Sequence, residues 1–123
     1  MKIRESGEMY LEHILTLQQS KDVVRAIDVA AISGYSKPSV SRALGLLKGA
    51  GYLSVDEKSG NITLTPEGLA LAGKIAQRHR TLRSFLEKIG VGREAAEEDA
   101  CKIEHVISDE TFLRVQAFLS EAE

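Results

Sequence analysis

A change of hydrophobic periodicity near the middle of the sequence constrains the fold most. Residues 25–34 (RAIDVAAISG) and the segment YSKPSVSRALGLLKGAGYL have the spacing of two short helices, with Gly34 ending the first and Ser36 capping the second. Two short alternating runs follow, Tyr52–Val55 and Ile62–Leu64, around the polar turn EKSGN, which predicts a β-hairpin. Two helices joined by a short glycine-containing turn and followed by a hairpin predict a winged helix-turn-helix.

The remaining segments have helical periodicity. Residues 5–19 place apolar side chains near helical spacing. Thr65, followed by proline, opens a long helix that we expect to end near Lys88. Another helix is expected over about Arg93–Ile107, and Ser108 is a suitable cap for a last one. The predicted fold is mostly α with a small β-hairpin.

The charge is distributed unevenly between the two parts into which we divide the chain. The net charge is −2, but residues 1–66 carry 8 basic and 7 acidic side chains, whereas residues 67–123 carry 8 and 11. We assign residues 1–66 to an N-terminal winged helix-turn-helix domain and residues 67–123 to a helical domain. An acidic second half beside a first half that is not acidic is compatible with DNA binding, although charge alone is a weak indication.

The segment after Ser36 has the pattern of a DNA-recognition helix. Val40, Leu44 and Leu47 form an apolar stripe that is expected to face inward. The residues between them are short or cationic, which suits contacts to phosphates and bases in the major groove while the wing touches the backbone. The predicted DNA contacts are Lys37, Pro38, Ser39, Ser41 and Arg42. The alternatives are a solvated helix face and a winged helix that binds only proteins.

Near the C-terminal end, the segment DACKIEHVISDE brings together three side chains that can bind metals. On a helix, Cys101, Glu104 and His105 share one face, because they stand at positions i, i+3 and i+4. A thiolate, a carboxylate and an imidazole suit a divalent transition metal, but three ligands leave it under-coordinated. Glu97 could lie on the same face or be solvated. Candidates for further ligands on other helices are His79, Met9, Glu12 and His13. Taken singly, such residues are more often core or solvated side chains.

Several classes of protein fit the sequence poorly. The chain has no apolar run of about 18 residues, so no membrane span is expected. Its charged N-terminus does not have the pattern of a signal peptide, and a single cysteine cannot form an internal disulfide, so we expect a cytoplasmic protein. An enzyme is not expected, because cysteine and histidine four residues apart on one helix do not easily form a nucleophile–base pair with a third, orienting group.

Five segments, which together span about residues 4–120, resemble the diphtheria-toxin-repressor and manganese-transport-regulator family. They are EMYLEHI, SKPSVSRAL, GYLSVDEKSGNITLTPEG, RHRTLRSFL and EDACKIEHVISDE. The resemblance implies a metal-activated, homodimeric transcription repressor with an N-terminal winged helix and a helical dimerisation domain. It also implies binding of Fe²⁺ or Mn²⁺ and of a palindromic double-stranded operator, usually at metal-uptake genes.

The resemblance assigns ligand positions residue by residue. Met9 and Cys101 stand where iron-type members have methionine and cysteine, and where manganese-type members have aspartate and glutamate. Glu104 and His105 match ligands of both types. Two further ligands are implied for a second metal position: His79 matches both types, and Glu12 matches a carboxylate of manganese-type members.

The sequence also departs from the family pattern. Arg83 stands where the iron-type prototype has a glutamate ligand, and Glu97 stands where it has a histidine ligand. A closely spaced pair of metals that uses Glu12 and His79 is therefore an alternative to the prototype's second site, and we expect one or two divalent metals per chain. Longer relatives carry a small C-terminal β-barrel domain, which we expect this chain to lack because it ends at Glu123.

The ligand types predict which metal is sensed. Methionine and cysteine make the site softer than a carboxylate set would, which favours Fe²⁺ over Mn²⁺ as the signal. A metal held by Met9 and Glu12 from the first half and by Cys101, Glu104 and His105 from the second would fix one half against the other and so set the spacing of the recognition helices in a dimer. The alternatives are an Mn²⁺-responsive regulator of the same fold and a winged-helix DNA binder that does not sense metal.

Overall fold

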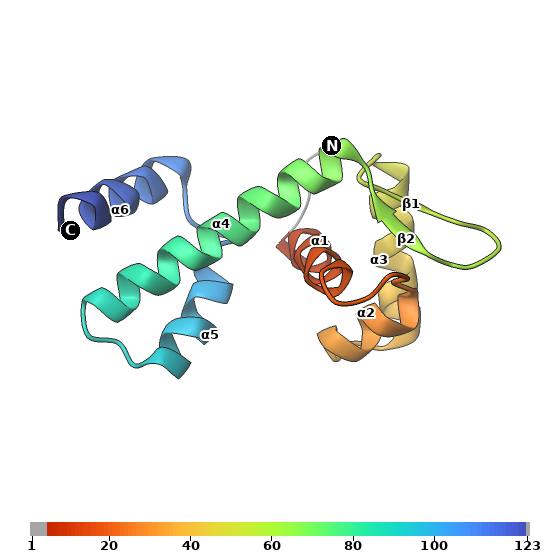
Figure 1. Ribbon diagram of the computed structural model, residues 1–123, viewed down its shortest axis with the longest axis horizontal. Helices are drawn as coiled ribbons and strands as arrows, with labels where there is room; N and C mark the ends of the chain where they lie inside the picture. Colours follow the sequence, from red (N-terminus) through yellow and green to blue (C-terminus); the bar gives the residue numbers. More distant parts are fainter. Residues whose placement is uncertain (1–4, 123) are drawn as a thin grey trace. The chain divides into compact units, whose positions relative to one another are not determined.

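The computed structural model describes residues 5–122 and shows a mostly helical fold with one small hairpin (Figure 1). The elements in chain order are α1 (Glu5–Gln18), α2 (Ala26–Ser33), α3 (Lys37–Gly49), β1 (Leu53–Val55), β2 (Ile62–Leu64), α4 (Pro66–Lys88), α5 (Arg93–Ile103) and α6 (Asp109–Ala122). The predicted fold class is confirmed. None of the helices in this part of the chain is both long and apolar enough to cross a membrane.

The chain forms two compact units, Met1–Gly73 and Lys74–Glu123, and the division falls within α4. We call them the winged-helix unit and the sensor unit. The sequence placed its domain boundary seven residues earlier, before residue 67, and that boundary stays a prediction.

The winged-helix unit is built around a core of apolar side chains from α1, α2, α3 and the hairpin. Leu11, Ile14, Val29 and Val40 are completely buried there, and Ile62 of β2 closes the core from the hairpin side. The stripe predicted for the recognition helix is confirmed, since Val40, Leu44 and Leu47 are all buried.

The turn between α2 and α3 follows the predicted chemistry. Gly34 adopts a left-handed conformation with φ 76°, and its N–H donates to the carbonyl of Ala30. The side chain of Ser36 then accepts a hydrogen bond from the backbone N–H of Ser39, which caps α3. Glycine tolerates the positive φ without strain, and serine satisfies an N–H that the helix leaves open, so these two residues fix where α2 ends and α3 begins.

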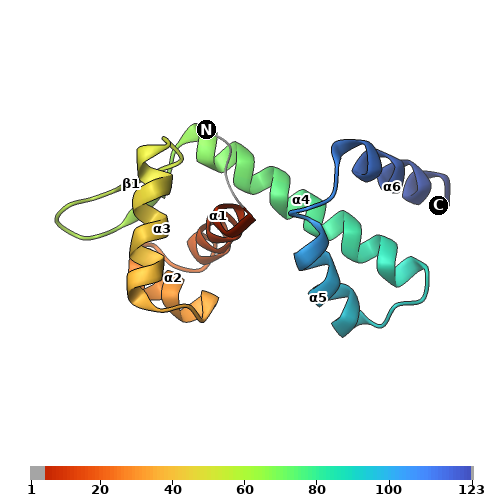
Figure 2. The ribbon, with the colours of Figure 1, turned by 180° about the vertical axis from the view of Figure 1, so that it is seen from behind.

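The wing is tied to the segment before α2. Strands β1 and β2 pair antiparallel, with Leu53 opposite Leu64 and Val55 opposite Ile62. The N–H of Ile62 donates to the carbonyl of Val24 at 2.7 Å, and Nε of Arg25 donates to the carbonyl of Ser59 at 2.7 Å. The hairpin loop extends beyond the helices of its unit in both ribbon views (Figures 1 and 2). The hairpin is therefore anchored to the segment before α2 at the start of β2 and again in its loop.

A close approach of two backbones fixes the start of α4. The hydroxyl of Thr65 donates to the carbonyl of Gly51 and accepts from the N–H of Gly68, as expected for the predicted cap. A Cβ at Gly68 would overlap the backbone oxygen of Tyr52. Only glycine fits at this position, which holds the first turn of α4 against the start of the hairpin.

Candidate metal centre

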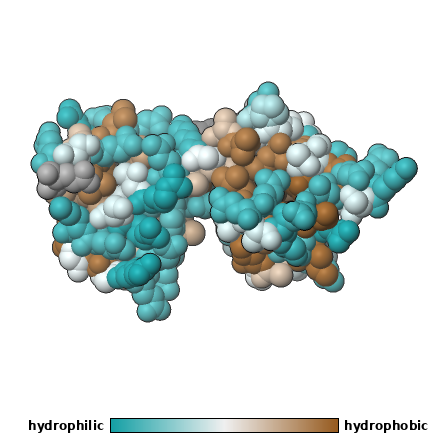
Figure 3. All heavy atoms as spheres, viewed as in Figure 1, coloured by the Kyte–Doolittle hydropathy of each residue, from teal (hydrophilic) through white to brown (hydrophobic). Residues whose placement is uncertain are grey.

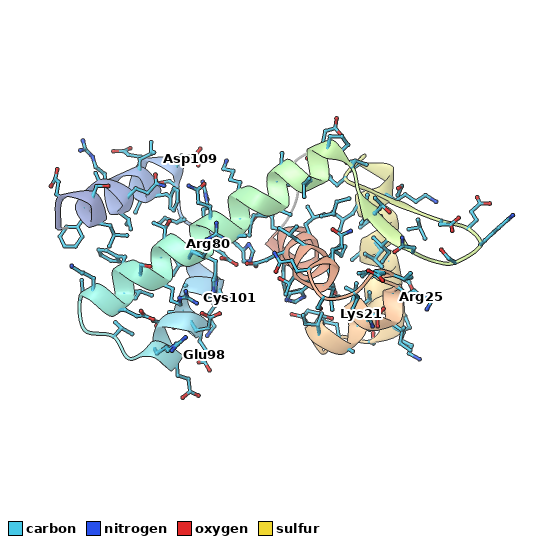
Figure 4. The ribbon with its side chains drawn as sticks, viewed as in Figure 1. Lys21, Arg25, Arg80, Glu98, Cys101 and Asp109 are labelled. Carbon is cyan, nitrogen blue, oxygen red and sulfur yellow. The ribbon has the colours of Figure 1, made fainter. Side chains whose placement is uncertain are left out.

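The sensor unit positions its candidate ligands on α4, on α5 and just beyond α5. His79 lies on α4 and Cys101 lies on α5, where it is exposed (Figure 4). Glu104 is the C-cap of α5, directly after its last residue Ile103, and His105 follows it. Met9 and Glu12 lie in the winged-helix unit, half-buried on α1, one turn apart on the same side of the helix.

The predicted end of α5 is wrong, and this changes the geometry of the site. The helix ends at Ile103 rather than near Ile107, so His105 does not continue the face that carries Cys101. The cause lies on α4: Nη1 of Arg78 donates to the carbonyl oxygens of Glu104 and Ile107, at 3.5 and 3.2 Å. Because these carbonyls have a partner outside the helix, the chain can turn here toward α6.

Glu104 is the central residue of the site. With 1% of its surface exposed, it is the one charged side chain that is buried among the residues whose burial is described. Neither of its carboxylate oxygens has a hydrogen-bond partner within the described part of the chain. A buried carboxylate without hydrogen bonds is costly unless a cation accompanies it.

Two imidazole nitrogens lie against this carboxylate. Nδ1 of His79 is 3.1 Å from Oε2 of Glu104, and Nε2 of His105 is 3.2 Å from Oε1. These distances are short, yet Nδ1 of His79 forms no hydrogen bond with any described residue. Two ligands at a right angle around a metal, each about 2.1 Å from it, lie about 3 Å apart. The distances therefore fit ligands that share one ion, and the absence of a hydrogen bond between Nδ1 of His79 and the described residues distinguishes the arrangement from a hydrogen-bonded pair.

The thiol of Cys101 completes this cluster. Its Sγ, one donor nitrogen of His79 and one oxygen of Glu104 all lie within 4.8 Å of one another. Sulfur, nitrogen and oxygen together form a donor set of intermediate softness, which suits a divalent transition metal. The structure thus brings together three predicted ligands, His79, Cys101 and Glu104, and their donor types and spacing fit a metal.

Three residues around the cluster were not recognised as its supports from the sequence. Glu97 binds Nε2 of His79 through Oε1 at 2.8 Å and accepts from Arg83 through Oε2 at 3.2 Å. Partial burial alone would raise the pKa of the Glu97 carboxyl, but the hydrogen bonds from His79 and Arg83 outweigh it and lower that pKa. Arg78 holds the turn after α5, as described above. The four-residue spacings Glu97–Cys101 and His79–Arg83 were the available signal.

The residues predicted to touch DNA are exposed on α3. Lys37, Pro38 and Ser39 form its first turn, and Ser41 and Arg42 follow. The structure confirms that they face outward, and their contacts with DNA stay a prediction.

Comparison with protein families assigns both parts of the chain. Residues 2–61 match the N-terminal DNA-binding domain of iron-dependent repressors, and residues 65–123 match their metal-binding and dimerisation domain. The chain belongs to the iron-dependent repressor family. It is therefore a metal-dependent DNA-binding transcriptional repressor by family, and the expectation that it is not an enzyme is confirmed on that ground.

Individual relatives agree with this assignment. The chain is 33% identical to an HTH-type transcriptional regulator of Methanocaldococcus jannaschii over 95% of its own length and 94% of the relative. It is 36% identical to the transcriptional regulator MntR of Salmonella typhimurium, covering 96% of this chain and 74% of that one.

Solved structures show the same architecture. The manganese regulator SloR superposes with a TM-score of 0.82 at 26% identity, over 98% of this chain and 55% of SloR. T. acidophilum IdeR superposes with a TM-score of 0.80 at 26% identity, over 98% of this chain and 55% of IdeR. The chain thus spans about half the length of these two regulators.

Proposed function

We propose that the chain is an Fe²⁺-responsive, homodimeric repressor that binds a palindromic operator at metal-uptake genes in the cytoplasm. Residues 1–66 bind DNA in this proposal, and residues 67–123 bind metal and form the dimer. The observation that supports metal sensing most directly is the buried Glu104 carboxylate, with two imidazole nitrogens at 3.1 and 3.2 Å and a thiol in the same cluster.

In this proposal the metal ligands come from both parts of the sequence. The sensor unit supplies four of them through its compact cluster, and the sequence resemblance adds two from α1. The full proposed set is Met9, Glu12, His79, Cys101, Glu104 and His105. The bound cation supplies the positive charge that the Glu104 carboxylate lacks. His79 and His105 would bind the same cation as this carboxylate, and Cys101 would make the donor set softer.

DNA and metal then strengthen each other's binding. If the metal favours the DNA-binding arrangement, DNA must favour metal binding by the same factor, and such couplings are typically about 1–3 kcal/mol. Lys37, Pro38, Ser39, Ser41 and Arg42 contact the operator in this proposal, and the wing contacts the phosphate backbone.

Exposed apolar side chains support dimerisation of the sensor unit. Leu113 and Phe118 of α6 are 61% and 46% exposed, and Val106 before α6 is 64% exposed. Figure 3 shows hydrophobic residues at the surface among hydrophilic ones. A second copy of the chain would cover such side chains, which are costly to leave in water.

Operator binding measured against free Fe²⁺ and free Mn²⁺ tests the proposal. We expect activation at lower free Fe²⁺ than free Mn²⁺, because Cys101 and Met9 are softer than the carboxylates they replace. The change Cys101→Asp should move the response toward Mn²⁺. Equal activation by both metals at matched free concentrations would contradict the iron preference.

Two observations favour Mn²⁺ as a second candidate. Glu12 supplies a hard carboxylate, and several relatives of the chain bear the name of manganese regulators. An Mn²⁺ response that exceeds the Fe²⁺ response would select this alternative.

A further inference from the structure

We infer that Glu97 is a positioning residue for the metal centre: it fixes the imidazole of His79 so that Nδ1 faces Glu104, and Arg83 in turn fixes Glu97. The inference rests on the proposed metal-sensing function, because it gives His79 the role of a ligand. It assigns to Glu97 and Arg83 a role in support, and not in coordination.

The two ring nitrogens of His79 have different surroundings. Nε2 lies 2.8 Å from Oε1 of Glu97, and Nδ1 lies 3.1 Å from Oε2 of Glu104 without forming a hydrogen bond. An ionised carboxylate can only accept, so Nε2 carries the hydrogen in its bond to Glu97. In the neutral imidazole, Nδ1 then keeps its lone pair, and this lone pair is directed to the side of the cluster.

This arrangement has the features of a supported metal ligand. Histidines that bind metals usually donate their other ring N–H to a carboxylate, a carbonyl or a water, which fixes both tautomer and ring orientation. The side chain of His79 is only 14% exposed, so Glu97 replaces much of the water that would otherwise solvate Nε2.

Arg83 completes the arrangement one helical turn from His79. Its Nη1 donates to Oε2 of Glu97 at 3.2 Å, so both carboxylate oxygens of Glu97 are engaged. Along α4, Arg83 follows His79 by four residues, and along α5, Glu97 precedes Cys101 by four. One turn of each helix therefore supplies donor atoms, and a neighbouring turn supplies the groups that hold them.

Arg83 also argues against Glu97 as a ligand. A guanidinium is always charged in proteins, so a cation at Glu97 would meet a fixed positive charge close by. Among the described residues, the group of donor atoms within 4.8 Å of one another that includes His79 also includes Cys101 and Glu104, but not Glu97.

The simplest alternative is an ordinary surface ion pair. The side chains of Arg83 and Glu97 are 36% and 51% exposed, and ion pairs at such positions contribute little to folding. A test must therefore measure the His79 tautomer and the metal affinity, and not stability alone.

The experiment uses the full chain labelled with ¹⁵N-histidine, with the variants Glu97→Ala and Glu97→Gln and the matched control Glu98→Gln on the exposed side of the same helix (Figure 4). Imidazole ¹⁵N spectra of the metal-free protein at mildly alkaline pH report the tautomer, and a His79→Gln variant assigns the signals. Calorimetry with Mn²⁺ alone measures affinity.

We expect the Nε2–H tautomer at His79 in the unsubstituted chain and in Glu97→Gln, whose amide oxygen still accepts, and a mixture of tautomers in Glu97→Ala. Glu97→Ala should weaken Mn²⁺ binding by about 10- to 100-fold, the usual effect of losing such a partner. Glu98→Gln should change neither quantity.

Two results would overturn the inference. An unchanged tautomer and affinity in Glu97→Ala would leave only a surface ion pair. A lost affinity with an unchanged tautomer would make Glu97 a ligand itself. Failure of the unsubstituted chain to bind Mn²⁺ would count against the proposed function, whereas the tautomer in the metal-free protein tests the support by Glu97 independently.

Discussion

The winged-helix unit and the sensor unit keep their functional side chains in opposite places. In the first, the residues predicted to meet DNA are exposed, and the core beneath them is apolar. In the second, the central functional group is a carboxylate with 1% of its surface exposed and no hydrogen bond to the described residues. The exposed residues of α3 are solvated by water when DNA is absent, so leaving them without DNA costs little free energy. The buried carboxylate of the sensor unit is costly unless a cation accompanies it.

The largest effect is expected from Gly68→Ala, which tests how rigidly the winged-helix unit is built. The added methyl would overlap the backbone oxygen of Tyr52, and we expect a loss of about 3 kcal/mol in the free energy of unfolding. Denaturant unfolding measures it. Gly73→Ala, on the same helix and with open space at Cβ, should instead stabilise by about 0.5–1 kcal/mol. Equal effects of the two changes would contradict the close approach.

The next largest effect concerns the charge that the sensor unit buries. Metal at 100 times its dissociation constant should raise the free energy of unfolding by about 2.7 kcal/mol, and chelation should remove this gain. In Glu104→Gln the gain should disappear, while the metal-free protein becomes no less stable, because a buried charge has been removed. Thermal unfolding with and without metal measures both. Operator binding that is insensitive to chelator would instead support a regulator that does not sense metal.

A change on α3 should affect DNA and leave the sensor unaltered. Arg42→Ala should weaken operator binding by about 1–3 kcal/mol if it reads a base, or lower the salt dependence by about one ion if it contacts a phosphate. Metal affinity without DNA should stay the same. Calorimetry and salt titrations separate these outcomes, and Arg93→Ala, an exposed change on α5, is the control.

The smallest effect is a pH dependence that two carboxylates of the winged-helix unit contribute. Hydrogen bonds from Lys21 and from the backbone of Arg25 lower the pKa of Asp28, and those from Ser59 and the backbone of Lys58 lower that of Asp56. The stability that these carboxylates add is present above their ordinary pKa of about 3.9, and it is lost as the pH falls through their lower folded values. Asp28→Asn and Asp56→Asn should flatten this loss in acid unfolding curves.

Local chemistry made most of the fold predictable. The helix caps at Ser36 and Thr65 and the helix end at Gly34 depend on hydrogen bonds to residues three or four positions away in the sequence. The hairpin follows from the alternation of apolar and polar residues around a polar turn. The cluster of Cys101 with Glu104 was also predictable, because their spacing is set by one helix.

Contacts between helices were not predictable in the same way. The hydrogen-bond partners of Arg78 lie 26 to 31 residues further along the chain, and the partners of His79 lie 18 and 25 residues away, so these contacts depend on how α4, α5 and α6 pack. The end of α5 was misjudged for this reason: its stop is set by an arginine on another helix and not by a residue of its own.

Arg78 limits which substitutions the sensor unit tolerates. Arg78 reaches two carbonyls, the side chain of Asp109 and the face of Phe112, whose ring centre is 5.3 Å from its guanidinium carbon. Lysine has the same charge but no planar fork with which to span such a set. If the sensor unit were joined to another winged helix, Arg78 would therefore have to be kept together with the metal ligands. Arg78, which precedes His79 in the sequence, holds the turn that positions Glu104.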